Sequence, residues 1–178
     1  MSALLFAFFV GIFAFGDAAG AQRHQNGTGF AALTDAEKTT MILMREEEKL
    51  ARDVYIQMYE FWGATIFSNI SVSEQRHMDA VLQLLVKYGI PDPVAGNAVG
   101  VFINQDLQKL YTGLIAQGQL SLWDAYRVGR AIEEMDLTDL QKAIDETEKA
   151  DLENVYANLL RGSFNHLDAF NFHLDSLQ

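Results

Sequence analysis

The sequence predicts an all-α fold in which four long helices pack as a bundle, with a long crossover between the second and third helices that contains a short extra helix. Apolar residues recur with the helical period of about 3.6 in four long segments. The 178 residues include only two prolines, Pro91 and Pro93, so long stretches are free to be helical. No stretch shows the period-2 alternation or the β-branched runs that are typical of strands.

The first helix is expected over residues 34–62. Thr34 followed by Glu37 is the signature of a capping box, and Gly63 is a typical helix terminator. The second helix is expected over residues 68–88, since a glycine and a proline follow directly.

Residues 89–103 carry no helical pattern and are expected to form a loop, followed by a short helix over 105–117 that Gly118 ends. The third long helix should begin after Ser121 and run to about residue 147, and the fourth should span about 151–174.

The N-terminal region differs in kind from the rest. Residues 1–21 are apolar and then small, which resembles a secretory signal or a short membrane anchor, although no basic residue precedes the apolar run. Residues 22–33 are expected to be a flexible linker, and residues 34–178 the bundle domain. The protein is therefore expected to be exported or associated with the cell envelope. If the N-terminal segment is an anchor, it would attach the protein to the membrane.

Charge and cysteine content exclude several classes of function. A formal net charge of −11 repels nucleic acid and attracts cations, so no nucleic-acid partner is expected. The absence of cysteine excludes disulfides, thiolate metal sites and iron–sulfur ligation.

The strongest chemical signal is Glu74 followed by His77 on the apolar line of the second helix. Residues three apart lie on one helical face, where a carboxylate and an imidazole can bind one metal ion. A buried glutamate without a partner is costly, and a metal ion is one of the few ways to stabilise it there.

The other long helices each offer further ligands. Of the three consecutive acids Glu46–Glu48, periodicity alone does not choose between Glu47 and Glu48 as the inward one, and such runs are usually solvated. On the third helix Glu133 faces inward, whereas Glu134 groups with Arg130 on a polar face. On the fourth helix His166 lies on the apolar stripe, a position where a histidine is more often a packed core residue than a ligand.

Four sequence blocks resemble a known family: MREEEKLARDVY (44–55), SEQRHMDAV (73–81), IEEMDLTDL (132–140) and RGSFNHLDAF (161–170). They are similar to an uncharacterised ferritin-like domain family of bacteria and archaea, related to rubrerythrins and ferritins. This resemblance implies a ferritin-like four-helix bundle with a di-iron site, and it selects Glu48 over Glu47, because the ligand glutamate of the first helix precedes a tyrosine by seven, here Tyr55.

The chain departs from the di-iron pattern at one position. The fourth helix should offer a glutamate three residues before His166, but Ser163 stands there. By the same resemblance, Asp136 lies where rubrerythrin-type bundles place an additional carboxylate, and we expect it to supply the missing ligand.

The expected function is binding of two iron or manganese ions by Glu48, Glu74, His77, Glu133, Asp136 and His166, with reaction of the metal centre with oxygen or peroxide. The protein would then be a di-iron oxidoreductase of the ferroxidase or peroxidase type, with Tyr55 and Tyr126 packing around the centre or donating to its ligands. The alternative is a non-catalytic metal-binding or structural bundle of the cell envelope. A homodimer is the default expectation for such a bundle.

Overall fold

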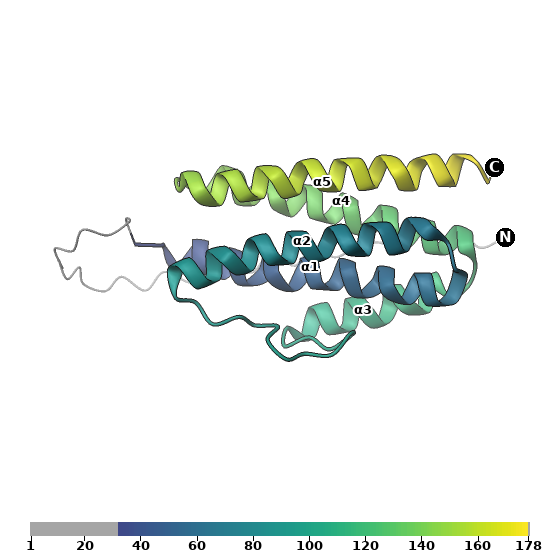
Figure 1. Cartoon of the computed structure of the whole chain (residues 1–178), viewed down its shortest axis with the longest axis horizontal. Helices are drawn as coiled ribbons and strands as arrows, with labels where there is room; N and C mark the ends of the chain where they lie inside the picture. The colour runs from purple at the N-terminus through teal and green to yellow at the C-terminus, as the bar shows by residue number, and fades with distance from the viewer. Residues whose placement is uncertain (1–31, 178) are drawn as a thin grey trace. The chain divides into compact units, whose positions relative to one another are not determined.

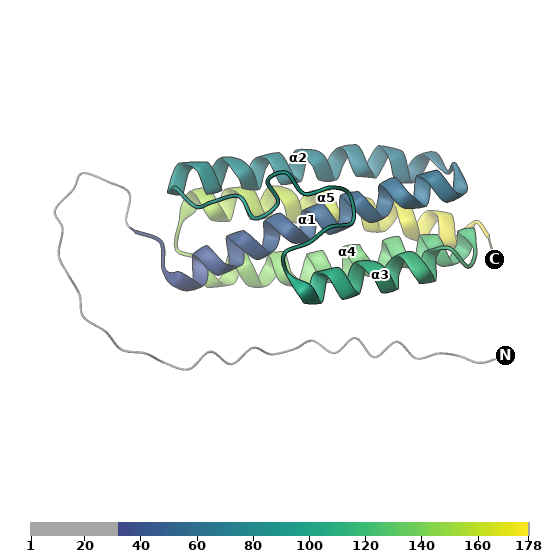
Figure 2. The ribbon, with the colours of Figure 1, turned by 90° about the horizontal axis from the view of Figure 1, so that it is seen from below.

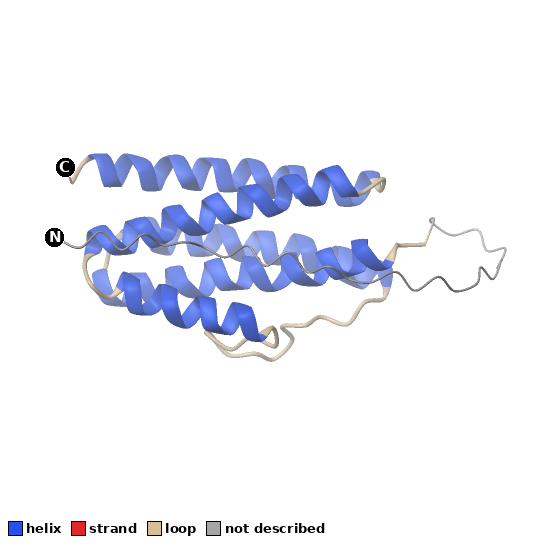
Figure 3. Cartoon of the chain, turned by 180° about the vertical axis from the view of Figure 1, so that it is seen from behind, coloured by secondary structure: helices blue, strands red, loops and turns tan. Residues whose placement is uncertain are grey.

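The computed structural model describes residues 32–177, and within this range all regular structure is helical, with no strand (Figures 1 and 3). The all-α prediction is confirmed. The five helices are α1 (Asp35–Trp62), α2 (Thr65–Tyr88), α3 (Gln105–Gly118), α4 (Leu122–Glu146) and α5 (Ala150–Asp175).

The ends of α1 follow from the residues that predicted them. The Glu37 amide donates to the Thr34 hydroxyl at 3.1 Å, and the Thr34 amide donates to the Glu37 carboxylate at 2.8 Å, which completes the capping box. Gly63 ends the helix with a φ of 64°, a left-handed conformation that favours glycine.

Two predicted boundaries were wrong. The second helix begins at Thr65 rather than Ser68. The prediction missed this start because the N-cap residue, Ala64, has no side chain that could form a capping hydrogen bond. Gly118 does not terminate α3 but is its last residue. Its role is packing, because a Cβ there would collide with the Met58 side chain.

The helices pack mainly as two pairs, α1 with α2 and α4 with α5, and each pair is joined by a short connection (Figure 1). Further contacts join α1 to α4, α2 to α5, and α3 to both α1 and α4. Two apolar clusters fill the interior: one includes Val54, Phe67 and Phe170, and the other includes Met41, Leu85 and Leu152. In each long helix, the residues of one apolar cluster are separated from those of the other by a stretch that contains buried polar residues. These stretches form a polar layer, and the candidate site lies in it.

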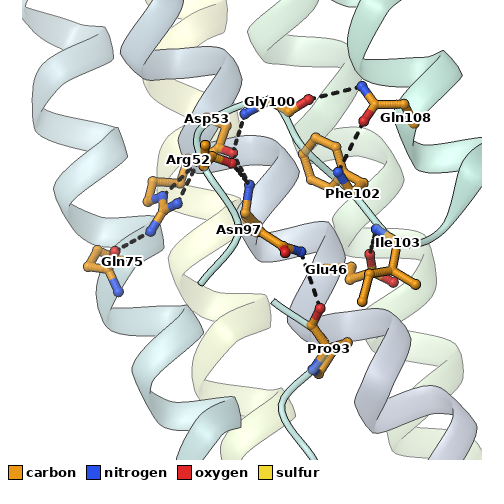
Figure 4. Close-up of polar contacts among 12 residues, drawn as sticks. Glu46, Arg52, Asp53, Gln75, Pro93, Asn97, Gly100, Phe102, Ile103 and Gln108 are labelled. Atoms are coloured by element: carbon orange, nitrogen blue, oxygen red, sulfur yellow. Dashed lines mark hydrogen bonds and ion pairs between the residues drawn. The ribbon is translucent and has the colours of Figure 1, made fainter. Parts of the chain in front are cut away.

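The crossover between α2 and α3 lies across α1 (Figure 2) and binds buried polar side chains of that helix (Figure 4). The Glu46 carboxylate accepts from the amides of Ile103 and Asn104 at 3.0 and 3.1 Å. Asp53 accepts from the Gly100 amide at 2.8 Å and forms an ion pair with Lys49. The general tendency of such acidic runs to be solvated does not hold here, because the crossover covers Glu46 and the side chains of Glu47 and Glu48 are also buried.

The predicted signal-like segment at 1–21 and most of the linker at 22–33 lie outside the described residues. Leu33 is buried and belongs to the same apolar cluster as Met41, so the compact unit begins at this residue. Among the residues that the structure describes, no helix combines the length and the apolar character needed to cross a membrane.

Candidate metal centre

Six side chains that the sequence singled out lie in the polar layer, and all of the long helices contribute. Five of them are at least nine-tenths buried, and the side chain of His77 is 11% exposed. They are Glu48 from α1, Glu74 and His77 from α2, Glu133 and Asp136 from α4, and His166 from α5.

Glu74 lies at the centre of this layer and contacts both histidines. Its Oε2 is 2.8 Å from Nδ1 of His77, and its Oε1 is 2.7 Å from Nδ1 of His166. Glu48 completes one side, with Oε2 at 3.1 Å from Nδ1 of His77, and Glu133 completes the other, with Oε2 at 3.5 Å from Nδ1 of His166.

The result is two groups of three ligands that share Glu74: Glu48, Glu74 and His77, and Glu74, Glu133 and His166. Within each group the potential ligand atoms lie within 4.8 Å of one another. Carboxylate oxygens and imidazole nitrogens are ligands of divalent transition-metal ions. A carboxylate with one oxygen in each group is placed to bridge two ions.

Several of these atoms lack the hydrogen bonds that buried polar atoms normally make. Among the described residues, both oxygens of Glu74, Oε2 of Glu133 and Nδ1 of His166 have no hydrogen-bond partner, although they lie close together. Their short mutual distances thus lack hydrogen-bonding geometry. Buried oxygen and nitrogen atoms arranged in this way are able to hold a shared cation.

The pKa values of the metal-free site show how strongly the groups depend on one another. Burial lowers the pKa of both histidines, but contacts with carboxylates overcome it: Glu48 and Glu74 raise the pKa of His77 to about 10, and Glu133 and Glu74 raise that of His166 to about 9. Burial raises the pKa of Glu48 to about 8 and that of Glu133 to about 7. Burial opposes ionisation of Glu74 as well, but the two histidines hold its pKa at about 2.

Tyr55 forms a hydrogen bond with one of the candidate ligands. Its hydroxyl donates to Oε1 of Glu133 at 2.5 Å, and the ring packs against Phe67 and Phe170. The expected packing of Tyr55 is confirmed, and its role as a donor to a metal ligand stays a prediction. Tyr126 stacks on Phe67 and His173 and serves packing.

Asp136 is buried near both groups but belongs to neither of them. Burial and the charges of Glu48 and Glu133 raise its pKa well above the usual range. Its expected role as a replacement ligand stays a prediction. Ser163 is fully buried, and its hydroxyl donates to the Leu159 carbonyl at 3.3 Å, back along its own helix.

The sequence analysis missed the role of Gly162. A Cβ at this position would lie 2.5 Å from Nε2 of His77, so the glycine leaves room for the imidazole on the side opposite its carboxylate partners. The two imidazole rings stack with centroids 5.5 Å apart. The sequence did offer a signal for this role: a glycine in the interior of a predicted helix, directly before Ser163.

A profile of the family described as an uncharacterised protein domain, DUF2202, matches residues 37–177. The chain is 51% identical over 138 residues to the uncharacterised protein MJ0754 of Methanocaldococcus jannaschii, which covers 78% of this chain and 75% of the relative. It is also similar to the crystal structure of hypothetical protein MJ0754 from Methanococcus jannaschii DSM 2661, with a TM-score of 0.82 and 47% identity, over 85% of this chain and 87% of that one. These matches confirm the expected kinship with an uncharacterised family that has an archaeal member.

Proposed function

This chain belongs to the DUF2202 family, and we propose that it holds two iron or manganese ions in a carboxylate–histidine centre that reacts with oxygen or peroxide. One observation carries the proposal. Glu74 is fully buried, both of its oxygens lack hydrogen-bond partners within residues 32–177, and each oxygen lies against the Nδ1 atom of a different histidine.

We further propose that the fold is a ferritin-like four-helix bundle. Helices α1, α2, α4 and α5 would form the bundle, with α3 as part of the single long connection, which is the wiring of ferritin-like proteins. The placement of ligands on all four long helices supports this assignment. In di-iron bundles, likewise, each helix contributes carboxylates or histidines to a centre in the interior.

The residues of this chain would each have a definite task. Glu48 and His77 would hold one ion, Glu133 and His166 the other, and Glu74 would bridge them. Tyr55 would keep Glu133 oriented through its hydrogen bond, and the apolar clusters on both sides would exclude water. Two iron or manganese ions bound there would supply the electrons for reduction of oxygen or peroxide.

Metal binding is expected to release protons and to strengthen as pH rises. His77 and His166 have pKa values of about 10 and 9 in the metal-free protein, so both are protonated at neutral pH and must lose a proton to bind a metal. Affinity should therefore increase up to about pH 9 to 10. Titration calorimetry with Mn²⁺ in buffers of different ionisation enthalpy measures the released protons, and heats that do not depend on the buffer would contradict the proposal.

Gly162→Ala should weaken metal binding roughly tenfold or more, the usual effect of disturbing a group that positions a ligand. The added methyl group would push the His77 ring away from Glu48 and Glu74. Gly113→Ala is the matched control, since a Cβ at this helical position meets nothing within 4 Å. Mn²⁺ affinities of the two variants and the wild type test this, and equal affinity for Gly162→Ala would exclude a positioning role.

Redox turnover is tested by adding ferrous iron under air, or peroxide to the iron-loaded protein, and following ferric iron and peroxide optically. We expect faster reaction with the wild type than with Glu74→Ala. If the two proteins reacted at equal rates although the wild type binds metal, the protein would be a metal-binding protein without catalytic activity.

That outcome is the second candidate function, a non-catalytic metal-binding protein, and Ser163 favours it. The hydroxyl of Ser163 bonds to its own helix and offers the centre no carboxylate. The centre would then have one oxygen ligand fewer than the usual di-iron set.

A further inference from the structure

The two histidines are the part of the candidate centre that lies nearest to solvent. The side chains of His77 and His166 are 11% and 10% exposed, whereas none of the four carboxylate residues is more than 3% exposed. His77 belongs to α2 and His166 to α5, and their rings stack with centroids 5.5 Å apart. The centre is therefore most open to solvent along the contact between these two helices.

No other helix within residues 32–177 covers the contact between α2 and α5. Helix α3 contacts α1 and α4 but neither α2 nor α5, and it lies on the opposite side of the bundle from α2 in Figure 2. The crossover that leads to α3 lies across α1. A molecule can thus approach the centre between α2 and α5 without displacing α3 or the crossover.

A cleft of about 330 Å³, open to solvent, lies along the same contact, a volume that admits a small molecule. Its walls are side chains within 65–70 of α2 and 169–173 of α5, and none of them is Asp, Glu, Lys or Arg. The cleft comes within one helical turn of a candidate ligand on both helices. Ile70 in its wall is four residues before Glu74, and Ala169 is three residues after His166.

The chemistry of the cleft favours a small neutral molecule. Its walls offer no carboxylate to a metal cation, and the net charge of −11 repels anions. Ile66, Ile70 and Phe172 provide apolar surface, while Asn69 and His173 offer groups that form hydrogen bonds. Molecular oxygen and hydrogen peroxide are both small and neutral, and both suit walls of this kind.

We propose that a small neutral oxidant reaches the candidate centre through the cleft between α2 and α5, past Ile70 and Ala169. The inference rests on the proposed function, because it gives the route by which the oxidant of that reaction enters. Ala169 is the residue at which the route is most easily blocked. It lines the cleft and is partly exposed, so a larger side chain there would occupy part of the cleft volume.

Nitric oxide is the probe for this route, because it is a neutral diatomic molecule that binds ferrous iron without turnover. The full chain is loaded with ferrous iron in the absence of oxygen and mixed with nitric oxide, and the binding rate is followed optically. We expect binding to Ala169→Phe to be several-fold slower than to the wild type, at equal iron content. Ala157→Phe is the matched control, since Ala157 is a partly exposed alanine of the same helix outside the cleft, and it should bind at the wild-type rate.

Formation of ferric iron after mixing with oxygen, and separately with peroxide, distinguishes the two oxidants. Slowing with both in Ala169→Phe supports a shared route, slowing with one assigns the route to that oxidant, and slowing with neither would overturn the proposal. Iron content and Tm show whether the variant is folded, and Ala169→Leu, with a smaller side chain, provides the same test with less risk to packing.

The failure of this route is distinguishable from the failure of the proposed function. Equal nitric oxide rates in the wild type, Ala169→Phe and Ala169→Leu, all with iron bound, would overturn the route and leave the proposed function standing. Absence of bound iron in the wild type would overturn the proposed function, and the route with it.

Discussion

Replacement of Glu74 by alanine is expected to remove both metal ions from the protein. Glu74 is the only residue common to the two ligand groups, with one oxygen 2.8 Å from His77 and the other 2.7 Å from His166. Its loss leaves each ion without the bridging carboxylate and leaves two buried histidines without their shared partner. Elemental analysis of the purified variant should find almost no iron or manganese.

The single histidine variants should behave differently. His77→Ala and His166→Ala each disrupt one group, so each is expected to retain about one ion per chain. Asp79→Ala is the matched control, because Asp79 is an exposed acid on the same helix as Glu74 and should keep both ions. If Glu74→Ala bound as much metal as Asp79→Ala, a centre bridged by Glu74 would be excluded.

Asp53→Ala should lower the free energy of unfolding by about 3–5 kcal/mol, the usual cost of leaving a buried charge without its partner. The side chains of Lys49 and Asp53 are 1% and 0% exposed, and Asp53 also accepts from Arg52 and from the Gly100 amide. The variant would leave the Lys49 ammonium buried with the Ala98 carbonyl, 2.9 Å away, and the Phe102 ring, and would remove one of the hydrogen bonds between the crossover and α1.

Urea unfolding measures this loss directly. Asp35→Ala is the control, since the Asp35–Lys38 pair is on the surface and its removal should leave the midpoint unchanged. An equal midpoint for Asp53→Ala would mean that the buried pair and the crossover contribute little to stability.

The sequence predicted the helices well where they carry local signals. Thr34 with Glu37 and Gly63 act within one turn of the helix end that they define, and the structure has them in those roles. Ala64 carries no such signal, and the start of α2 was therefore missed. The burial of Glu46 was also unpredictable, because it depends on a crossover without periodicity that reaches α1 from about 57 residues further along the chain.

Part of the candidate centre was also predictable from a local signal within one helix. Glu74 and His77 share one helical face, and the apolar residues around them indicated burial. The choice of Glu48 over Glu47 needed the resemblance to rubrerythrins, since periodicity within one helix does not reveal which partner helix each acid faces. The structure brings Glu48 to His77, whereas Glu47 belongs to neither ligand group. The room that Gly162 leaves for His77 spans two helices and has no counterpart within either sequence segment.

The central claim is the dinuclear centre, and the metal content of the purified wild-type protein tests it most directly. The full chain is expressed with iron and manganese available, and bound metal is counted by elemental mass spectrometry. We predict about two iron or manganese ions per chain, as two ligand groups that share Glu74 require. Absence of bound metal, together with a Tm that added iron leaves unchanged, would contradict this account and would favour a metal-free structural bundle.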